Sequence, residues 1–131
     1  MTTLKRTIII CFIALLTGLN ASMAEANLQT EATSVYKWQD NQIFFNVRFY
    51  THSSLTRYLV TGAKIRVEAF DTKTGERFLN NVSTYDGAQI VVYYGGDKVV
   101  PFNPRFAELG TRNNASFKIT VEDVYYEILR R

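Results

Sequence analysis

The stretch QIFFNVRFY, residues 42–50, alternates along the chain with a period of two. One side of an extended segment would carry Ile43, Phe45, Val47 and Phe49, and the other side Phe44, Asn46, Arg48 and Tyr50. This alternation is typical of a β-strand that is buried on one face, because successive side chains point to opposite faces. The stretch therefore predicts a core strand with its apolar side inward.

The segment before this strand, Ala32 to Gln39, is predicted to pair with it. Asp40-Asn41 fits a two-residue hairpin turn, since both residue types tolerate a positive φ. In that register Trp38 lies opposite Ile43, and Tyr36 lies opposite Phe45. A slip of one residue would turn Trp38 to water, so the pattern specifies the register strongly.

The rest of the chain reads as further strands separated by turn signals. The predicted strands are a short one at Tyr58–Val60, then Ala63–Phe70, Phe78–Thr84, Gln89–Tyr94, Lys98–Val100 and Ser116–Glu122. The predicted turns are Asp71–Glu76, Asp86-Gly87 and Gly95-Gly96-Asp97, with Pro101 ending a strand because it lacks a backbone donor. Residues 101–114 are expected to form an irregular corner, with Phe102 and Phe106 filling its inner side.

Residues 123–131 fit two interpretations. Val121, Val124, Tyr125 and Ile128 follow helical spacing, whereas Val124, Tyr126 and Ile128 follow strand spacing if a bulge falls at Glu122-Asp123. The bulged strand is favoured because β-branched and aromatic residues dominate.

The whole pattern predicts an all-β fold. About seven or eight short strands with a turn every eight to twelve residues are typical of a single antiparallel β-sandwich of immunoglobulin-like type. A small β-barrel is the alternative. The domain is expected to span residues 27–131.

Three short pieces between Gly62 and Gly87 carry a family resemblance. They are Gly62–Val67, then Asp71 with Thr74-Gly75-Glu76, then Thr84 with Asp86-Gly87. Together they resemble part of the carboxypeptidase-regulatory or transthyretin-like β-sandwich pattern. The resemblance implies a folded accessory or binding module, and it brings no catalytic residue to this sequence.

Residues 1–26 have the order of a secretory signal peptide. Lys5 and Arg6 precede a short apolar run, and small residues follow, with cleavage expected after Ala24 or Ala26. The only cysteine, Cys11, would leave with this leader, so the mature chain would be free of disulfides. A secreted or periplasmic protein is expected, and the bacterial periplasm is favoured.

Charge argues against nucleic acid as a partner. Of 15 basic and 12 acidic residues, removal of Lys5, Arg6 and Glu25 leaves 13 and 11, a net charge of +2. Nucleic-acid binding calls for a larger and clustered basic excess. No second apolar run follows the leader, so no membrane span is expected.

The sequence contains few residues that are suited to catalysis. It predicts no catalytic residue, no metal and no cofactor. The chain has a single histidine, His52, so a hydrolytic site would need it with Ser53 or Ser54 on one loop. Zinc sites need several His or Cys ligands, which the mature chain lacks.

Aromatic and arginine side chains on the outward sides of strands are instead the candidate binding residues, because Tyr, Phe and Arg are enriched at interfaces. The candidates are Phe44, Arg48, Tyr50, Phe70, Tyr93 and Tyr125. They predict an exported, non-enzymatic binding or accessory protein that acts on a macromolecular partner, most simply a protein, through an aromatic strand face or an edge strand. A carbohydrate-binding module is the alternative, and a small hydrolase at His52 is less favoured. The partner's identity and the oligomeric state stay open.

Overall fold

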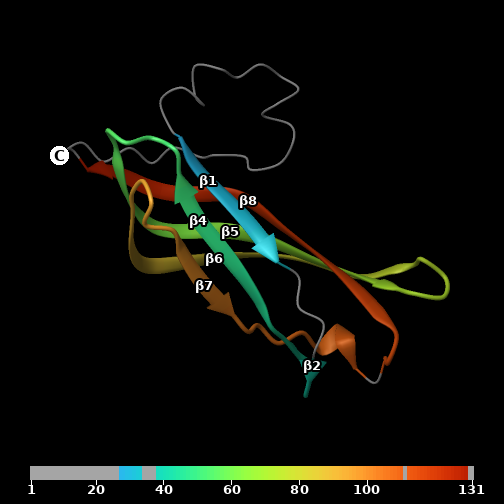
Figure 1. Cartoon of the computed structure of the whole chain (residues 1–131). Coiled ribbons are helices and arrows are strands. Elements are labelled where there is room, and N and C mark those ends of the chain that lie inside the picture. The colour runs from blue at the N-terminus through green and yellow to red at the C-terminus, as the bar shows by residue number, and fades with distance from the viewer. Residues whose placement is uncertain (1–26, 34–37, 111, 130–131) are drawn as a thin grey trace.

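Two three-stranded antiparallel sheets make up the fold (Figure 1). The computed structural model describes residues 27–33, 38–110 and 112–129, so the predicted signal peptide and Tyr36 lie outside the described residues. The first sheet has the order β1 (Leu28–Thr33), β4 (Phe45–Thr51), β7 (Lys98–Phe102). The second has the order β6 (Arg77–Val92), β5 (Arg57–Asp71), β8 (Ala115–Leu129). A short hairpin pairs β2 (Trp38–Gln39) with β3 (Gln42–Ile43), and a 3₁₀ turn, η1, spans Ala107–Leu109.

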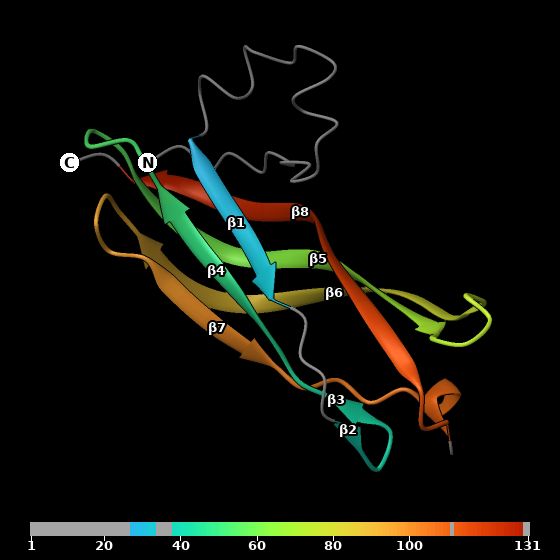
Figure 2. The ribbon, with the colours of Figure 1, turned by 45° about the vertical axis from the view of Figure 1, so that its right-hand side comes forward.

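The two sheets lie face to face, with the β1-β4-β7 sheet over the longer strands of the second (Figure 2). Inward side chains of both sheets form one buried cluster. The all-β class is therefore confirmed. The immunoglobulin-like type is not confirmed. Each of the two sheets has three strands, and those of the second sheet are 15 to 16 residues long. The sheets are also not closed into the alternative small barrel.

The QIFFNVRFY stretch behaves as its period predicts. Ile43, Phe45, Val47 and Phe49 are at most 1% exposed, so this side of the stretch is fully inward. The single predicted strand is divided at Phe44, however, into β3 of the short hairpin and β4 of the first sheet. Trp38 lies opposite Ile43, and the ring centroids of Trp38 and Phe117 are 5.4 Å apart. The turn residues Asp40 and Asn41 have φ values of 52° and 65°, which a two-residue hairpin of the mirror-image type requires.

The pairing strand differs from the predicted Ala32–Gln39 segment. The ladder begins earlier, at Leu28, and β1 pairs Ala32 with Val47. Near the turn the described pairing covers only Trp38 and Gln39. The pattern missed Leu28–Glu31 because only Leu28 there is strongly apolar, and Thr30 fills the second inward position.

The predicted turn at Asp86-Gly87 is wrong. Two predicted strands instead run on as the single sixteen-residue strand β6. Gly87 has a φ of 84°, and the pairing of β5 with β6 shifts between Val60 and Gly62, so a β-bulge bends the ladder without reversing it. The same bulge joins the predicted short strand Tyr58–Val60 to the one at Ala63–Phe70 as β5. A positive-φ glycine serves a bulge as well as a turn, and the local sequence does not separate the two.

The predicted turn at Gly95-Gly96 is present, and it joins the two sheets, since β6 and β7 lie in different ones. The backbone N–H of Gly96 donates to the carbonyl of Tyr93 at 2.9 Å, which closes a tight turn. The following strand, β7, then pairs with β4 of the other sheet. Pro101 does not end β7, because β7 is an edge strand and loses no ladder bond there.

The C-terminal segment confirms the bulged-strand interpretation. β8 runs from Ala115 to Leu129, and its pairing passes from Val121 to Asp123, which leaves Glu122 as the extra residue. Val124 and Tyr126 are consequently buried. In the corner before β8, Phe106 is buried as predicted. Phe102 is half-buried and stacks on Phe45 with ring centroids 5.1 Å apart.

The β5–β6 turn has the chemistry that its sequence predicts. The carboxylate of Asp71 accepts hydrogen bonds from the backbone N–H groups of Thr74 (3.0 Å) and Lys73 (2.8 Å), and Gly75 has a φ of 77°. These two hydrogen bonds lower the pKa of Asp71, with a smaller contribution from Arg112. The charged carboxylate therefore stabilises the folded turn.

The acid sensitivity of this turn is a testable consequence. A carboxyl group whose folded pKa is lowered stabilises the protein above its unfolded pKa of about 3.9, and that contribution disappears as the pH falls through the folded pKa. We expect Asp71→Asn to lower the thermal midpoint near neutral pH. The difference from the wild type should shrink between about pH 5 and pH 2. A difference that stays constant over this range in thermal melts would contradict this role for the carboxylate.

Candidate functional site

The structure does not bring the six predicted binding residues together. Arg48 and Tyr50 lie on the outer face of the β1-β4-β7 sheet, whereas Phe70 and Tyr125 lie on the other sheet. Phe44 stands between β3 and β4 and is 40% exposed. Tyr93 lies in the turn after β6. No single aromatic face therefore joins them.

Arg48 forms hydrogen bonds to acidic residues on both sides of β4. Its Nε and Nη2 atoms donate to Asp97 Oδ2 at 3.1 and 2.5 Å, and its Nη1 atom donates to Glu31 at 3.3 Å. The Cζ atom also lies 4.1 Å from the centre of the Tyr50 ring. The hydrogen bond to Asp97 is the main cause that raises the pKa of the Arg48 guanidinium. Its hydrogen-bonding groups thus connect β4 to β1 and to the turn before β7.

Phe70 and Tyr125 are half-buried on the β6-β5-β8 sheet. Phe70 pairs in register with Arg77 and Ser116. Tyr125 packs beside Gly62 and, with Thr61 and Glu127, lines a hollow of about 540 Å³. Neither side chain joins another of the six candidates.

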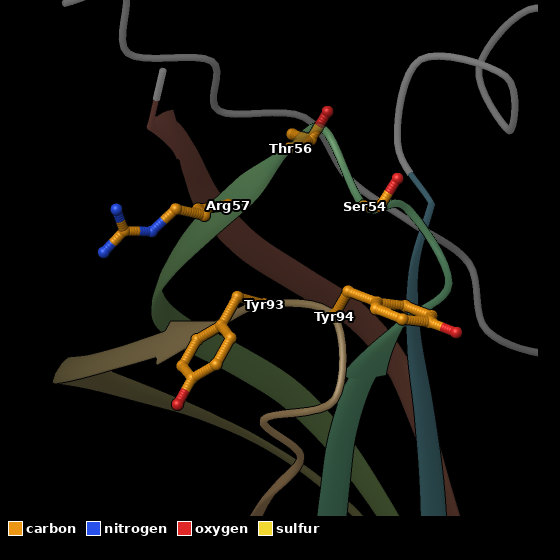
Figure 3. Close-up of a pocket in the computed structure, with 5 residues that line it drawn as sticks. All are labelled: Ser54, Thr56, Arg57, Tyr93 and Tyr94. Atoms are coloured by element: carbon orange, nitrogen blue, oxygen red, sulfur yellow. The ribbon is translucent and has the colours of Figure 1, made fainter. Parts of the chain in front are cut away.

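Tyr93 belongs to a different cluster, at the end of the molecule where β5 begins and β6 ends (Figure 3). A pocket of about 450 Å³ lies there, and we call it the tyrosine pocket. Its lining residues are Ser54, Thr56, Arg57, Tyr93 and Tyr94.

Both tyrosines of this pocket face solvent, with Tyr93 44% and Tyr94 61% exposed. Tyr93 lies on the side of Arg57, and Tyr94 lies on the side of Ser54 (Figure 3). Arg57 is exposed, and within the described residues it forms no ion pair. Two exposed aromatic rings beside an unpaired cation can take up apolar, aromatic and anionic groups of a ligand.

The turn below the pocket positions the Tyr93 ring. A Cβ atom built on Gly96 would lie 2.3 to 2.7 Å from three atoms of that ring, so the ring lies directly against the glycine backbone. The Nζ atom of Lys98 is 5.7 Å from the ring centre. Gly96 therefore leaves room for the ring in its observed position.

This contact makes Gly96→Ala a test of how Tyr93 is positioned. The added methyl group would overlap the Tyr93 ring and must displace it. Because the ring belongs to a side chain, it can rotate away while the backbone stays in place. We expect the NMR resonances of the Tyr93 ring to shift clearly and the thermal midpoint to change little. Unchanged ring resonances would contradict the packing of Tyr93 on Gly96.

Of the five pocket residues, only Tyr93 was among the predicted binding residues. The sequence predicted a strand through Tyr94 with one of the two tyrosines outward, but β6 ends at Val92 and both tyrosines fall in the turn. The Gly95-Gly96 pair could have indicated this, since a tight turn also includes the residues before it. Ser54, Thr56 and Arg57 join the pocket only through tertiary structure.

Two of the candidate hydrolytic residues, His52 and Ser53, each contact a residue close to them in the sequence. The His52 ring packs edge-on against Tyr50 with centroids 5.5 Å apart. The Ser53 hydroxyl accepts a hydrogen bond from the backbone N–H of Leu55 at 3.3 Å, and the backbone N–H of Ser53 donates to Thr51. Among residues 27–33, 38–110 and 112–129, no three His, Cys, Asp or Glu side chains gather as metal ligands would.

In the part of the chain that the structure describes, no helix has the length and apolar character needed to cross a bilayer. The chain matches no protein-family model, and no curated protein sequence matches it.

Proposed function

We propose that this chain is an exported, non-enzymatic binding protein that holds a macromolecular partner, most simply a protein, in the tyrosine pocket. The observation that carries the proposal is the pair of adjacent, exposed tyrosines beside Arg57, which forms no ion pair with another described residue. Tyr and Arg are, with Trp, the residue types enriched among the residues that dominate binding energy. The face-to-face sheets support the expected role of a β-sandwich accessory module.

The dimensions of the pocket favour one or two side chains of a partner as the occupant. Its volume of about 450 Å³ lies within the range of roughly 300–1,000 Å³ that is common for ligand sites. Tyrosine also contributes a large contact area at a low entropic cost, because its side chain has only two rotatable bonds. A partner loop that presents an apolar or acidic side chain would fit this lining.

The test compares the partners retained by matched variants. Tagged wild-type protein, a Tyr93→Ser/Tyr94→Ser variant and a Phe44→Ser control are used to capture proteins from the native envelope, followed by quantitative mass spectrometry. Phe44 is a matched control because it is about as exposed as Tyr93 and lies outside the pocket. We expect a partner that the wild type and the control retain and the double variant loses. Equal retention by all three proteins would refute the proposal.

Carbohydrate is the second candidate ligand. Ser54 and Thr56 add hydroxyl groups to the tyrosine rings and Arg57, and sugar recognition combines ring stacking with such polar groups. A glycan array separates the two candidates. Sugar binding by the wild type that disappears in the double tyrosine variant would favour carbohydrate as the ligand. Absence of sugar binding would favour a protein as the ligand.

Export is part of the proposal and has its own test. If residues 1–26 direct secretion, the chain expressed in a bacterial host should accumulate outside the cytoplasm. Its N-terminus should then be Glu25 or Asn27, following cleavage after Ala24 or Ala26. Cell fractionation with N-terminal sequencing gives the answer, and an unprocessed cytoplasmic product would contradict export.

A further inference from the structure

Open sheets leave edge strands whose unpaired backbone groups can pair with another chain, and proteins protect such edges with charges, prolines, bulges or short strands. Three of the four edges of the two three-stranded sheets carry such protection. β1 is only six residues long, with Glu31 near its end. β7 contains Lys98 and Pro101, and β8 has a bulge at Glu122 together with several charged side chains.

The edge at β6 lacks this protection over a central stretch. β6 is the longest described strand, and from Leu79 to Tyr85 it contains no charged residue, proline or bulge. Bulges lie on either side of this stretch, at Phe78 and at Gly87. The only strand that pairs with this stretch is β5, and within the described residues no other backbone hydrogen bond reaches it. With β5 it extends past the end of β7 towards the hairpin tip (Figure 2).

Opposite charges stand at the two ends of this neutral stretch, Arg77 before it and Asp86 after it. Arg77 lies on the outer face of the sheet, where it donates to Glu68 at 3.0 Å and its side chain remains 49% exposed. Asp86 is also exposed. Val82 lies between them and is 37% exposed.

We propose that this edge of β6 pairs with the same edge of a second copy of the chain. An antiparallel pair of identical strands is related by a two-fold axis perpendicular to the sheet. With the axis at Val82, each Val82 lies opposite its own copy. The end of the strand that carries Arg77 then meets the end of the partner strand that carries Asp86.

The pairing joins two three-stranded sheets into one six-stranded sheet. It provides hydrogen-bond partners for the outward N–H and C=O groups of β6, and it removes the exposed Val82 side chain from water. The opposite charges at the strand ends favour the antiparallel arrangement over the parallel one. The tyrosine pocket lies beyond the other end of β6 and stays accessible in this dimer.

The oligomeric state of the exported protein tests the proposal. Sedimentation velocity over a range of concentrations should show a monomer–dimer equilibrium. Val82→Lys should raise the dissociation constant by about tenfold or more, because it places two like charges opposite each other at the axis. The matched control is Val99→Lys on the β7 edge, where Val99 is 60% exposed, and it should leave the equilibrium unchanged. Circular dichroism verifies that both variants fold.

A crosslink tests the register directly. Directly opposite Cα atoms in antiparallel strands are about 4.5–5.5 Å apart, which lies within disulfide reach. In a background where the native Cys11 is replaced by Ala, Val82→Cys should oxidise to a covalent dimer, and Val99→Cys should not. A monomer at all concentrations, equal effects of the two lysine variants, or equal crosslinking of the two cysteine variants would overturn the proposal.

Discussion

Replacing Phe45 with alanine should lower the free energy of unfolding by about 3–5 kcal/mol, the usual cost of removing a buried phenylalanine side chain. Phe45 is 1% exposed and stacks on Phe102 with ring centroids 5.1 Å apart. Phe102 in turn meets Tyr85 of the opposite sheet, with centroids 4.9 Å apart. Loss of the Phe45 ring therefore leaves a cavity beside the aromatic contact that joins the two sheets.

The neighbouring residue provides the control for this prediction. Phe44→Ala removes the same side chain from a position that is 40% exposed, so we expect a change of no more than about 0.5–1 kcal/mol. Chemical denaturation of both variants measures the two effects. Equal losses would mean that the alternation of residues 42–50 does not decide which side is buried, and the strand register would be wrong.

Gly62→Ala should have the second largest effect. The new Cβ atom would lie 2.4 Å from the backbone carbonyl oxygen of Tyr85 on the adjacent strand. Gly62 sits at the bulge where the pairing of β5 shifts towards both β6 and β8, so the clash cannot be relieved without moving a paired strand. Overpacking of this kind costs about 1–3 kcal/mol. Thermal melts with a van't Hoff analysis measure the loss.

Gly96→Ala is the matched control, because the same methyl group is added at a similarly short distance from its neighbour. At Gly96 the neighbour is the ring of Tyr93, which can rotate away, whereas at Gly62 it is backbone. We expect the Gly96 variant to lose no more than about 0.5 kcal/mol. Similar losses for the two variants would show that the close approach of Gly62 to β6 is not what requires glycine.

The local pattern predicted most individual strands correctly and their connections less well. The inward residues of β4, the Asp71 turn and the bulge at Glu122 were all predictable, because each depends on neighbours in sequence. Asp86-Gly87 was predicted as a turn and is a bulge. A positive-φ glycine permits both outcomes, and the long pairing of β5 with β6 selects the bulge.

The binding site was the least predictable part. Tyr93 was a candidate from its sequence, but Arg57 lies far from it along the chain and joins it only because β5 begins where β6 ends. Arg48 was a candidate because it faces outward, and the structure shows that Asp97 and Glu31 already occupy its hydrogen-bonding groups. Exposure could be inferred from alternation, whereas ion pairing depends on which strands are neighbours.

The sequence by itself determined the all-β class and which side of the central strand is buried. Both follow from the period-two placement of apolar side chains, whose burial is the main favourable term in folding. Only the tertiary structure decided which strands share a sheet, where the chain crosses between sheets and which tyrosines face a common pocket. These features depend on pairing between residues distant in sequence, and alternation specifies the face of a strand without naming its neighbour.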